Sequence, residues 1–158
     1  MKRLFITILL LFSFSAFTNE ITYKDWRVNI VTDPITDKKT VSMKSVYVSN
    51  SDSISSAFFT VSCDSVFIVP FSIHNSLEDY EDGLIKVIFR VDKNTPVEME
   101  WEKKSSLLIT NQKEFLNKEI QGATKFIIRV GSKSTVDLKF PLAGYKKAYE
   151  RLEKECSN

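Results

Sequence analysis

The stretch FPLAGYKKAYERLEKEC, residues 140–156, decides the fold, because the chain before it consists of strand-like segments. It starts at the end of the last such segment, turns at Pro141, and continues as an amphipathic helix. Apolar residues recur in it at three- and four-residue spacing, which places them on one helical face. They are Leu142, Tyr145, Ala148, Tyr149, Leu152 and Cys156. The spacing predicts a C-terminal helix over residues 142–156 whose apolar face covers a β-core.

This helix carries one of the only two cysteines in the chain; the other, Cys63, lies in the strand-like run FFTVSCDSVFIVPF, residues 58–71. In an exported protein an even cysteine count indicates a disulfide, and two cysteines allow one intramolecular pairing. A zinc site needs more ligands than two thiols and the single histidine supply. A redox pair is typically closely spaced, as in C-x-x-C. We therefore expect a bond between Cys63 and Cys156 that ties the helix to the sheet.

The first residues are typical of a secretory signal peptide. Lys2 and Arg3 form a basic start, residues 4–12 are apolar, and small residues follow at positions 13, 15 and 16. The apolar run is too short for a membrane span, and no cysteine after it could carry a lipid. We expect cleavage of residues 1–18, a mature domain over residues 19–158, a periplasmic or secreted location, and no stable membrane anchor.

The charge balance argues against nucleic acid as a partner. Removing residues 1–18 removes Lys2 and Arg3 and no acid, so 22 basic against 20 acidic residues becomes 20 against 20. Such a near-neutral domain lacks the basic surface that binding to a phosphate backbone requires.

Between the signal and the helix the chain alternates short strands with turns. Strands are predicted over residues 21–32, 39–49, 57–64, 66–73, 84–92, 97–101, 107–110, 125–130 and 135–140. Residues 112–119 fit either a helical turn or a strand. Many short strands with regular turns predict one mainly β domain, an antiparallel β-sandwich or open barrel.

Two of these segments allow sharper predictions. In residues 84–92 the alternation places Ile85, Val87, Phe89 and Val91 inward. Because a proline cannot donate to a strand ladder, Pro70 predicts that its strand is an edge strand or is bulged there.

The polar segment HNSLEDYEDG, residues 74–83, holds the only candidate chemistry. A Ser/His/Asp triad could use His74 with Asp79 or Asp82, but no G-x-S-x-G elbow accompanies it. Glu78, Asp79, Glu81 and Asp82 could hold calcium, although the spacing of a known calcium loop is missing. A solvated loop explains both patterns, so we predict no catalytic, cofactor-binding or metal-binding residue.

Aromatic side chains offer another kind of site, since interfaces enrich for them. The candidates are Trp26, Phe58, Phe59, Tyr80 and Trp101. Most are expected in the core, with Tyr80 or Phe58 the one to face outward.

Four motifs in order resemble the VasI family of type VI secretion-associated periplasmic proteins. They are Trp26 with TDPITDKKTV (residues 32–41), FTVSCD (59–64), IFRVDKNTPVEMEWE (88–102) and FPLAGYKKAYERLEKEC (140–156). The resemblance implies a small β-sandwich-like domain with a C-terminal helix held by a disulfide. The chain departs from the family in its Phe-rich run and its acidic loop.

The functional hypothesis is a non-enzymatic exported binding or accessory protein of the bacterial envelope. The resemblance implies a link to type VI secretion and a partner in the envelope or the secretion apparatus. Two alternatives stay open: a peptidoglycan-directed hydrolase or hydrolase inhibitor, and a phage-encoded superinfection-exclusion factor.

Overall fold

The computed structural model describes residues 18–48, 56–70, 80–131 and 135–157, and these form ten strands and two helices. The first strands are β1 (Thr18–Tyr23), β2 (Trp26–Thr32), β3 (Lys39–Val48), β4 (Ser56–Ser62) and β5 (Val66–Pro70). They are followed by β6 (Gly83–Val91), β7 (Val97–Lys104), β8 (Leu107–Thr110), α2 (Lys113–Ile120), β9 (Lys125–Val130), β10 (Val136–Pro141) and α3 (Tyr145–Cys156). The predicted signal peptide lies almost entirely outside the described residues, and neither described helix is long and apolar enough to cross a membrane.

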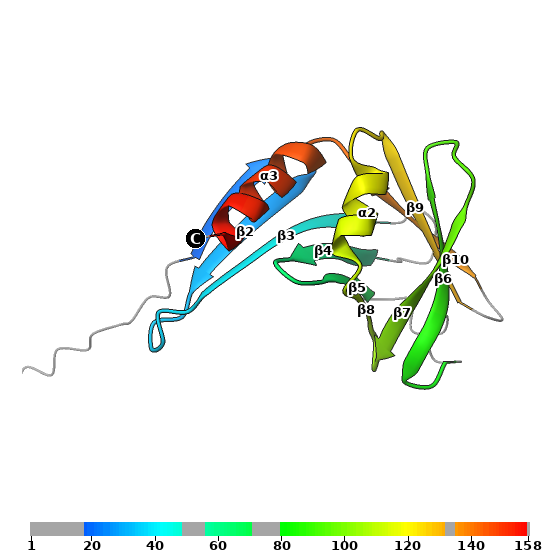
Figure 1. Ribbon diagram of the computed structural model, residues 1–158, viewed down its shortest axis with the longest axis horizontal. Helices are drawn as coiled ribbons and strands as arrows, with labels where there is room; N and C mark the ends of the chain where they lie inside the picture. The colour runs from blue at the N-terminus through cyan, green and yellow to red at the C-terminus, as the bar shows by residue number, and fades with distance from the viewer. Residues whose placement is uncertain (1–17, 49–55, 71–79, 132–134, 158) are drawn as a thin grey trace, which may run out of the picture.

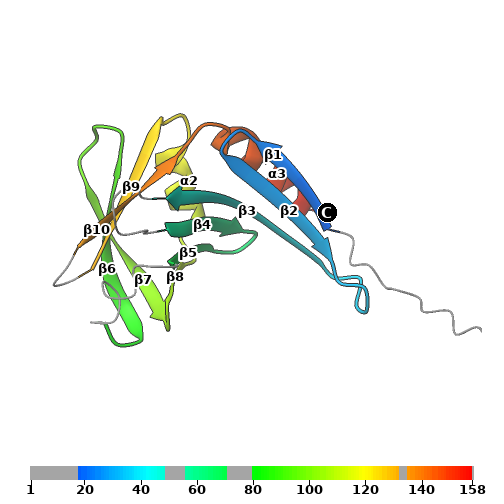
Figure 2. The same ribbon diagram turned by 180° about the vertical axis from the view of Figure 1, so that it is seen from behind.

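The strands form one antiparallel sheet in the order β1-β2-β3-β4-β5-β8-β7-β6-β9-β10. The sheet curls so that β10 comes to lie against β3, which makes an open barrel (Figures 1 and 2). The predicted fold class is confirmed: a mainly β domain with a C-terminal helix bonded to the sheet.

Strand β3 belongs to two parts of this sheet. Its first half pairs with β2, from Lys39 opposite Thr32 to Lys44 opposite Arg27. Its second half continues along β4 to Val48 opposite Ser56. Strands β1 and β2 with the first half of β3 therefore extend beyond the barrel as a wing, and α3 lies along one face of that wing (Figure 1).

Aromatic rings fill the barrel where the strands converge. Phe59 on β4 lies 5.3 Å from both Phe126 and Phe140, centroid to centroid, and Phe126 lies 5.8 Å from Phe89. Trp26 on the wing meets Phe59 edge-on at 5.9 Å. Alternation explains the pattern: Ile85, Val87, Phe89 and Val91 are all buried, as predicted.

Several element boundaries differ from the sequence prediction. Residues 21–32 are not one strand but parts of β1 and β2, because Lys24 adopts a left-handed φ of 54° and turns the chain, with Tyr23 opposite Trp26. The helix starts at Tyr145 rather than Leu142, because Pro141 ends β10 and Gly144 stands at the helix start with φ 90°. For residues 112–119, where the sequence left a helical turn and a strand open, the structure has a helix, α2, over Lys113–Ile120.

The prediction of an edge or bulged strand at Pro70 was wrong. Strand β5 is interior, between β4 and β8. Its pairing with β4 continues in register to Ala57 opposite Pro70. On the other side, β8 pairs only with residues Val66 to Ile68 of β5. Pro70 is tolerated because its missing N–H lies past the end of the β8 ladder.

Candidate functional site

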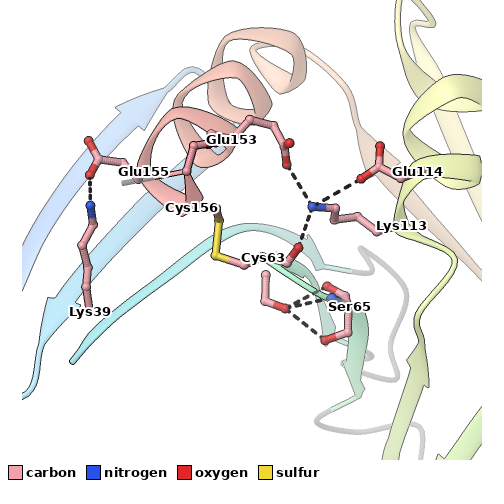
Figure 3. The surroundings of a disulfide bond; sticks show 10 residues. Lys39, Cys63, Ser65, Lys113, Glu114, Glu153, Glu155 and Cys156 are labelled. Atoms are coloured by element: carbon pink, nitrogen blue, oxygen red, sulfur yellow. Dashed lines mark hydrogen bonds and ion pairs between the residues drawn. A yellow bond between two sulfur atoms is a disulfide. The ribbon is translucent and has the colours of Figure 1, made fainter.

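The disulfide between Cys63 and Cys156 is present, with the two Cα atoms 5.6 Å apart (Figure 3). Cys63 lies in the turn after β4 rather than within a strand, and Ser62 N donates to Ser65 O across this turn at 2.8 Å. The bond joins α3 on the wing to the β4–β5 turn of the barrel. It therefore fixes the wing against the barrel.

A buried lysine reinforces this junction, and sequence reasoning missed it. Lys113, at the start of α2, donates from Nζ to the Cys63 carbonyl at 2.6 Å and to Glu153 Oε1 at 2.9 Å (Figure 3). Its ammonium also lies 5.9 Å from the ring centre of Tyr149, and burial raises the pKa of the Tyr149 hydroxyl. These contacts join α2, α3 and the β4–β5 turn, so Lys113 has a structural role.

Helix α3 is also bound to the wing by charge. Glu155 accepts from Lys39 on β3 at 2.6 Å and from Arg151 at 2.7 Å. The hydrogen bond from Lys39, aided by the charge of Arg151, lowers the pKa of Glu155.

Of the candidate chemical residues, only Glu81 and Asp82 lie in the part of the chain that the structure describes. His74, Glu78 and Asp79 lie outside the described residues, and Glu81 is exposed. Asp82 accepts from Lys103 Nζ at 2.9 Å and from Ser105 N at 2.8 Å, and the Lys103 hydrogen bond foremost lowers the pKa of Asp82. Asp82 thus holds the start of β6 to the β7–β8 turn. Among the described residues no group of three His, Cys, Asp or Glu side chains could hold a metal ion.

The aromatic candidates are mainly core residues. Trp26, Phe59 and Trp101 are fully buried. Tyr80 is half-buried against the core, and Phe58 is half-buried with the ammonium of Lys44 5.5 Å from its ring centre. None of the five is a free anchor on the surface.

Two surface features remain as candidate binding sites. The first, called the outer face, is the outward side of β8, β7, β6 and β9. On β6 it exposes Leu84 at 72% and Ile88 at 41%. The alternation on the neighbouring strands turns the half-buried Ile109 and Ile127 to the same side. Charged residues lie between these aliphatic side chains: Glu102 is opposite Leu84, and Arg129 is opposite Ile88.

The second feature, called the lysine pocket, is a cavity of about 490 Å³ between the end of α2, the start of α3 and the β1–β2 turn. Ile120, Leu142 and Tyr145 form its apolar floor, and Lys24, Lys146 and Lys147 stand at its rim. Its residues come from three distant segments, so no local sequence pattern could have revealed it.

The walls of the lysine pocket are held by close backbone contacts. Asp25 N donates to Ala143 O at 3.2 Å, and Trp26 Nε1 donates to Pro141 O at 2.9 Å. A Cβ on Gly144 would stand 2.7 Å from the Tyr23 carbonyl carbon and closer still to its oxygen. The β1–β2 turn therefore approaches the start of α3 as closely as only a glycine allows.

Comparison of the chain with protein-family models, curated proteins and solved structures finds no match. The resemblance to the VasI family stays a prediction from the motifs quoted above.

Proposed function

We propose that this protein is a non-enzymatic binding protein of the bacterial envelope that contacts a partner protein through the outer face. The observation that carries the proposal is the exposure of Leu84 and Ile88 on β6, a strand whose alternate residues form the core. Exposed aliphatic side chains interspersed with charged residues on one face of a sheet give a mixed surface that a partner protein can contact.

The disulfide supports the exported location. Bonds of this kind form and persist in oxidising compartments such as the periplasm and are rare in the cytosol. The bond between Cys63 and Cys156 agrees in this respect with the basic and apolar start of the chain. The mature protein would act in the periplasm or after secretion.

The resemblance supplies the more specific context. It favours a partner in the envelope or in a type VI secretion apparatus.

Photo-crosslinking in cells tests the contact. A photoreactive amino acid is placed at Leu84 or Ile88, and for control at Ile35, which is 90% exposed in the β2–β3 turn. We expect one envelope protein to be captured from both β6 positions and not from Ile35. Identification of a secretion-apparatus subunit would support the secretion context, and a peptidoglycan enzyme would favour the inhibitor alternative.

A second variant separates binding from folding. Leu84→Ser with Ile88→Ser should abolish the adduct formed from a third outer-face position, Ile109, without lowering the melting temperature, because both side chains point outward. An adduct that persists in this variant would refute the outer face as the contact. Export is checked separately, by fractionation and by blocked alkylation of both cysteines in the periplasmic extract.

A further inference from the structure

We propose that the lysine pocket binds a small amphiphile with an anionic head group. The apolar body would lie on Ile120, Leu142 and Tyr145, and the carboxylate or phosphate would lie among the rim lysines. This site shares no residue with the outer face, so the inference does not depend on the function proposed above.

The dimensions and lining of the cavity fit a small molecule. Its volume of about 490 Å³ lies inside the range of roughly 300–1,000 Å³ typical of ligand sites, which are mostly apolar with a few polar groups that fix orientation. The floor residues are large and apolar apart from the Tyr145 hydroxyl, which is already engaged with Asn117 Oδ1 at 3.2 Å. The floor therefore favours an apolar body over a polar one.

The lysines at the rim determine the sign of the charge that the head group should carry. Within the described residues, the ammonium groups of Lys24, Lys146 and Lys147 form no ion pair, a property they share with most exposed lysines of the chain; what sets them apart is their position around one apolar cavity. The first turn of α3 contains no acidic residue and has no side-chain cap. Its helix dipole adds positive potential at the same end. Three cations without counter-ions beside an apolar floor are complementary to an anion attached to an apolar group.

The pocket is also preformed. The contacts of Asp25, Trp26 and Gly144 described above fix the β1–β2 turn against the start of α3. At the opposite wall α2 ends with Ala123 N donating to Ile120 O at 3.0 Å, beside Gly122 with φ 85°. Because little of the wall has to be ordered on binding, little affinity is lost to conformational entropy.

The test titrates the mature, oxidised protein with dodecanoate, dodecyl phosphate and neutral dodecanoyl glycerol, each below its aggregation threshold. Binding is followed by amide chemical shifts in NMR spectra. We expect both anions to bind about tenfold or more tightly than the neutral probe. The shifts should be concentrated at Gly122, Ala123 and residues 144–147. The tighter of the two anions identifies the head group as carboxylate or phosphate.

Matched variants test the role of charge. Lys146→Gln with Lys147→Gln should weaken binding of both anions about tenfold. Lys38→Gln with Lys139→Gln removes the same charge from exposed positions outside the pocket and should leave binding unchanged. Ala123→Leu should fill the cavity and abolish binding of all three probes.

The proposal is overturned if the neutral probe binds as tightly as the anions, if the lysine variant keeps its affinity, or if the shifts lie elsewhere. None of these outcomes would change the crosslinks expected from the outer face. The two proposals can therefore fail separately.

Discussion

Replacing Gly144 by alanine tests whether the contact between the β1–β2 turn and α3 is as close as the geometry indicates. Two glycines form a matched pair for this purpose. Gly122 and Gly144 have similar positive φ values, 85° and 90°, but a Cβ on Gly122 meets nothing within 4 Å. A Cβ on Gly144 meets the backbone of Tyr23, which is paired with Trp26 in the hairpin and cannot rotate away as a side chain can.

The magnitudes follow from this difference. Gly122→Ala carries only the conformational cost of a left-handed alanine, about 1 kcal/mol. Gly144→Ala adds overpacking against a fixed backbone, about 1–3 kcal/mol more. At about 3 °C per kcal/mol for a domain of this size, we expect melting temperatures to fall by about 3 °C for Gly122→Ala and about 6–12 °C for Gly144→Ala.

Scanning calorimetry of the oxidised proteins measures both values. Equal losses in the two variants would show that the backbone accommodates the methyl group, and the argument for a preformed lysine pocket would lose its main support.

Three further predictions concern contacts elsewhere in the fold. Replacing both Cys63 and Cys156 by serine should destabilise the protein by up to about 4–5 kcal/mol, because the bond closes a sequence separation of 93 residues; an unchanged denaturant midpoint would contradict this. Lys113→Met should lower the free energy of unfolding by about 1–3 kcal/mol, because it leaves the Cys63 carbonyl without its donor. The matched control, Lys118→Met at the exposed lysine of α2, should cost under about 0.5 kcal/mol. Similar losses in the two variants would argue against the structural role of Lys113. Hydrogen bonds from Thr124, then from nearby backbone amides, lower the pKa of Asp92, so its stabilising effect is present above the unfolded-state pKa and is lost as pH falls through the folded value. The stability gap between wild type and Asp92→Asn should therefore shrink below about pH 4, and a gap that is constant down to about pH 3 would refute this.

Much of the fold could be predicted because it follows from short-range periodicity. The two-residue alternation of β6 was confirmed at every predicted inward position. On α3 the predicted apolar face was confirmed at Tyr145, Ala148, Tyr149 and Leu152, whereas Leu142 is buried ahead of the helix and Cys156 is half-buried in the disulfide. The disulfide followed from there being only two cysteines. The turn at Lys24 could not be predicted, because neither Gly, Asn nor Pro marks this left-handed position.

Features that depend on long-range pairing were also inaccessible. Whether β5 is an edge strand depends on β8, a later segment whose partner is not encoded locally. Lys113 looked like an ordinary charged residue in an ambiguous segment, and only the fold brings it to the Cys63 carbonyl. The same reason hides the lysine pocket, whose residues come from three distant segments.

The placement of α3 over the wing has a consequence for biosynthesis. Ribosomes make proteins from the amino end, so β1 and β2 emerge long before the helix that covers them; Trp26 and its acceptor on Pro141 are 115 residues apart. During that interval one apolar side of the nascent hairpin has no partner from its own chain. Apolar surface that is exposed in this way during synthesis is prone to aggregation. The contact between the first hairpin and α3 can therefore form only once nearly the whole chain has been made.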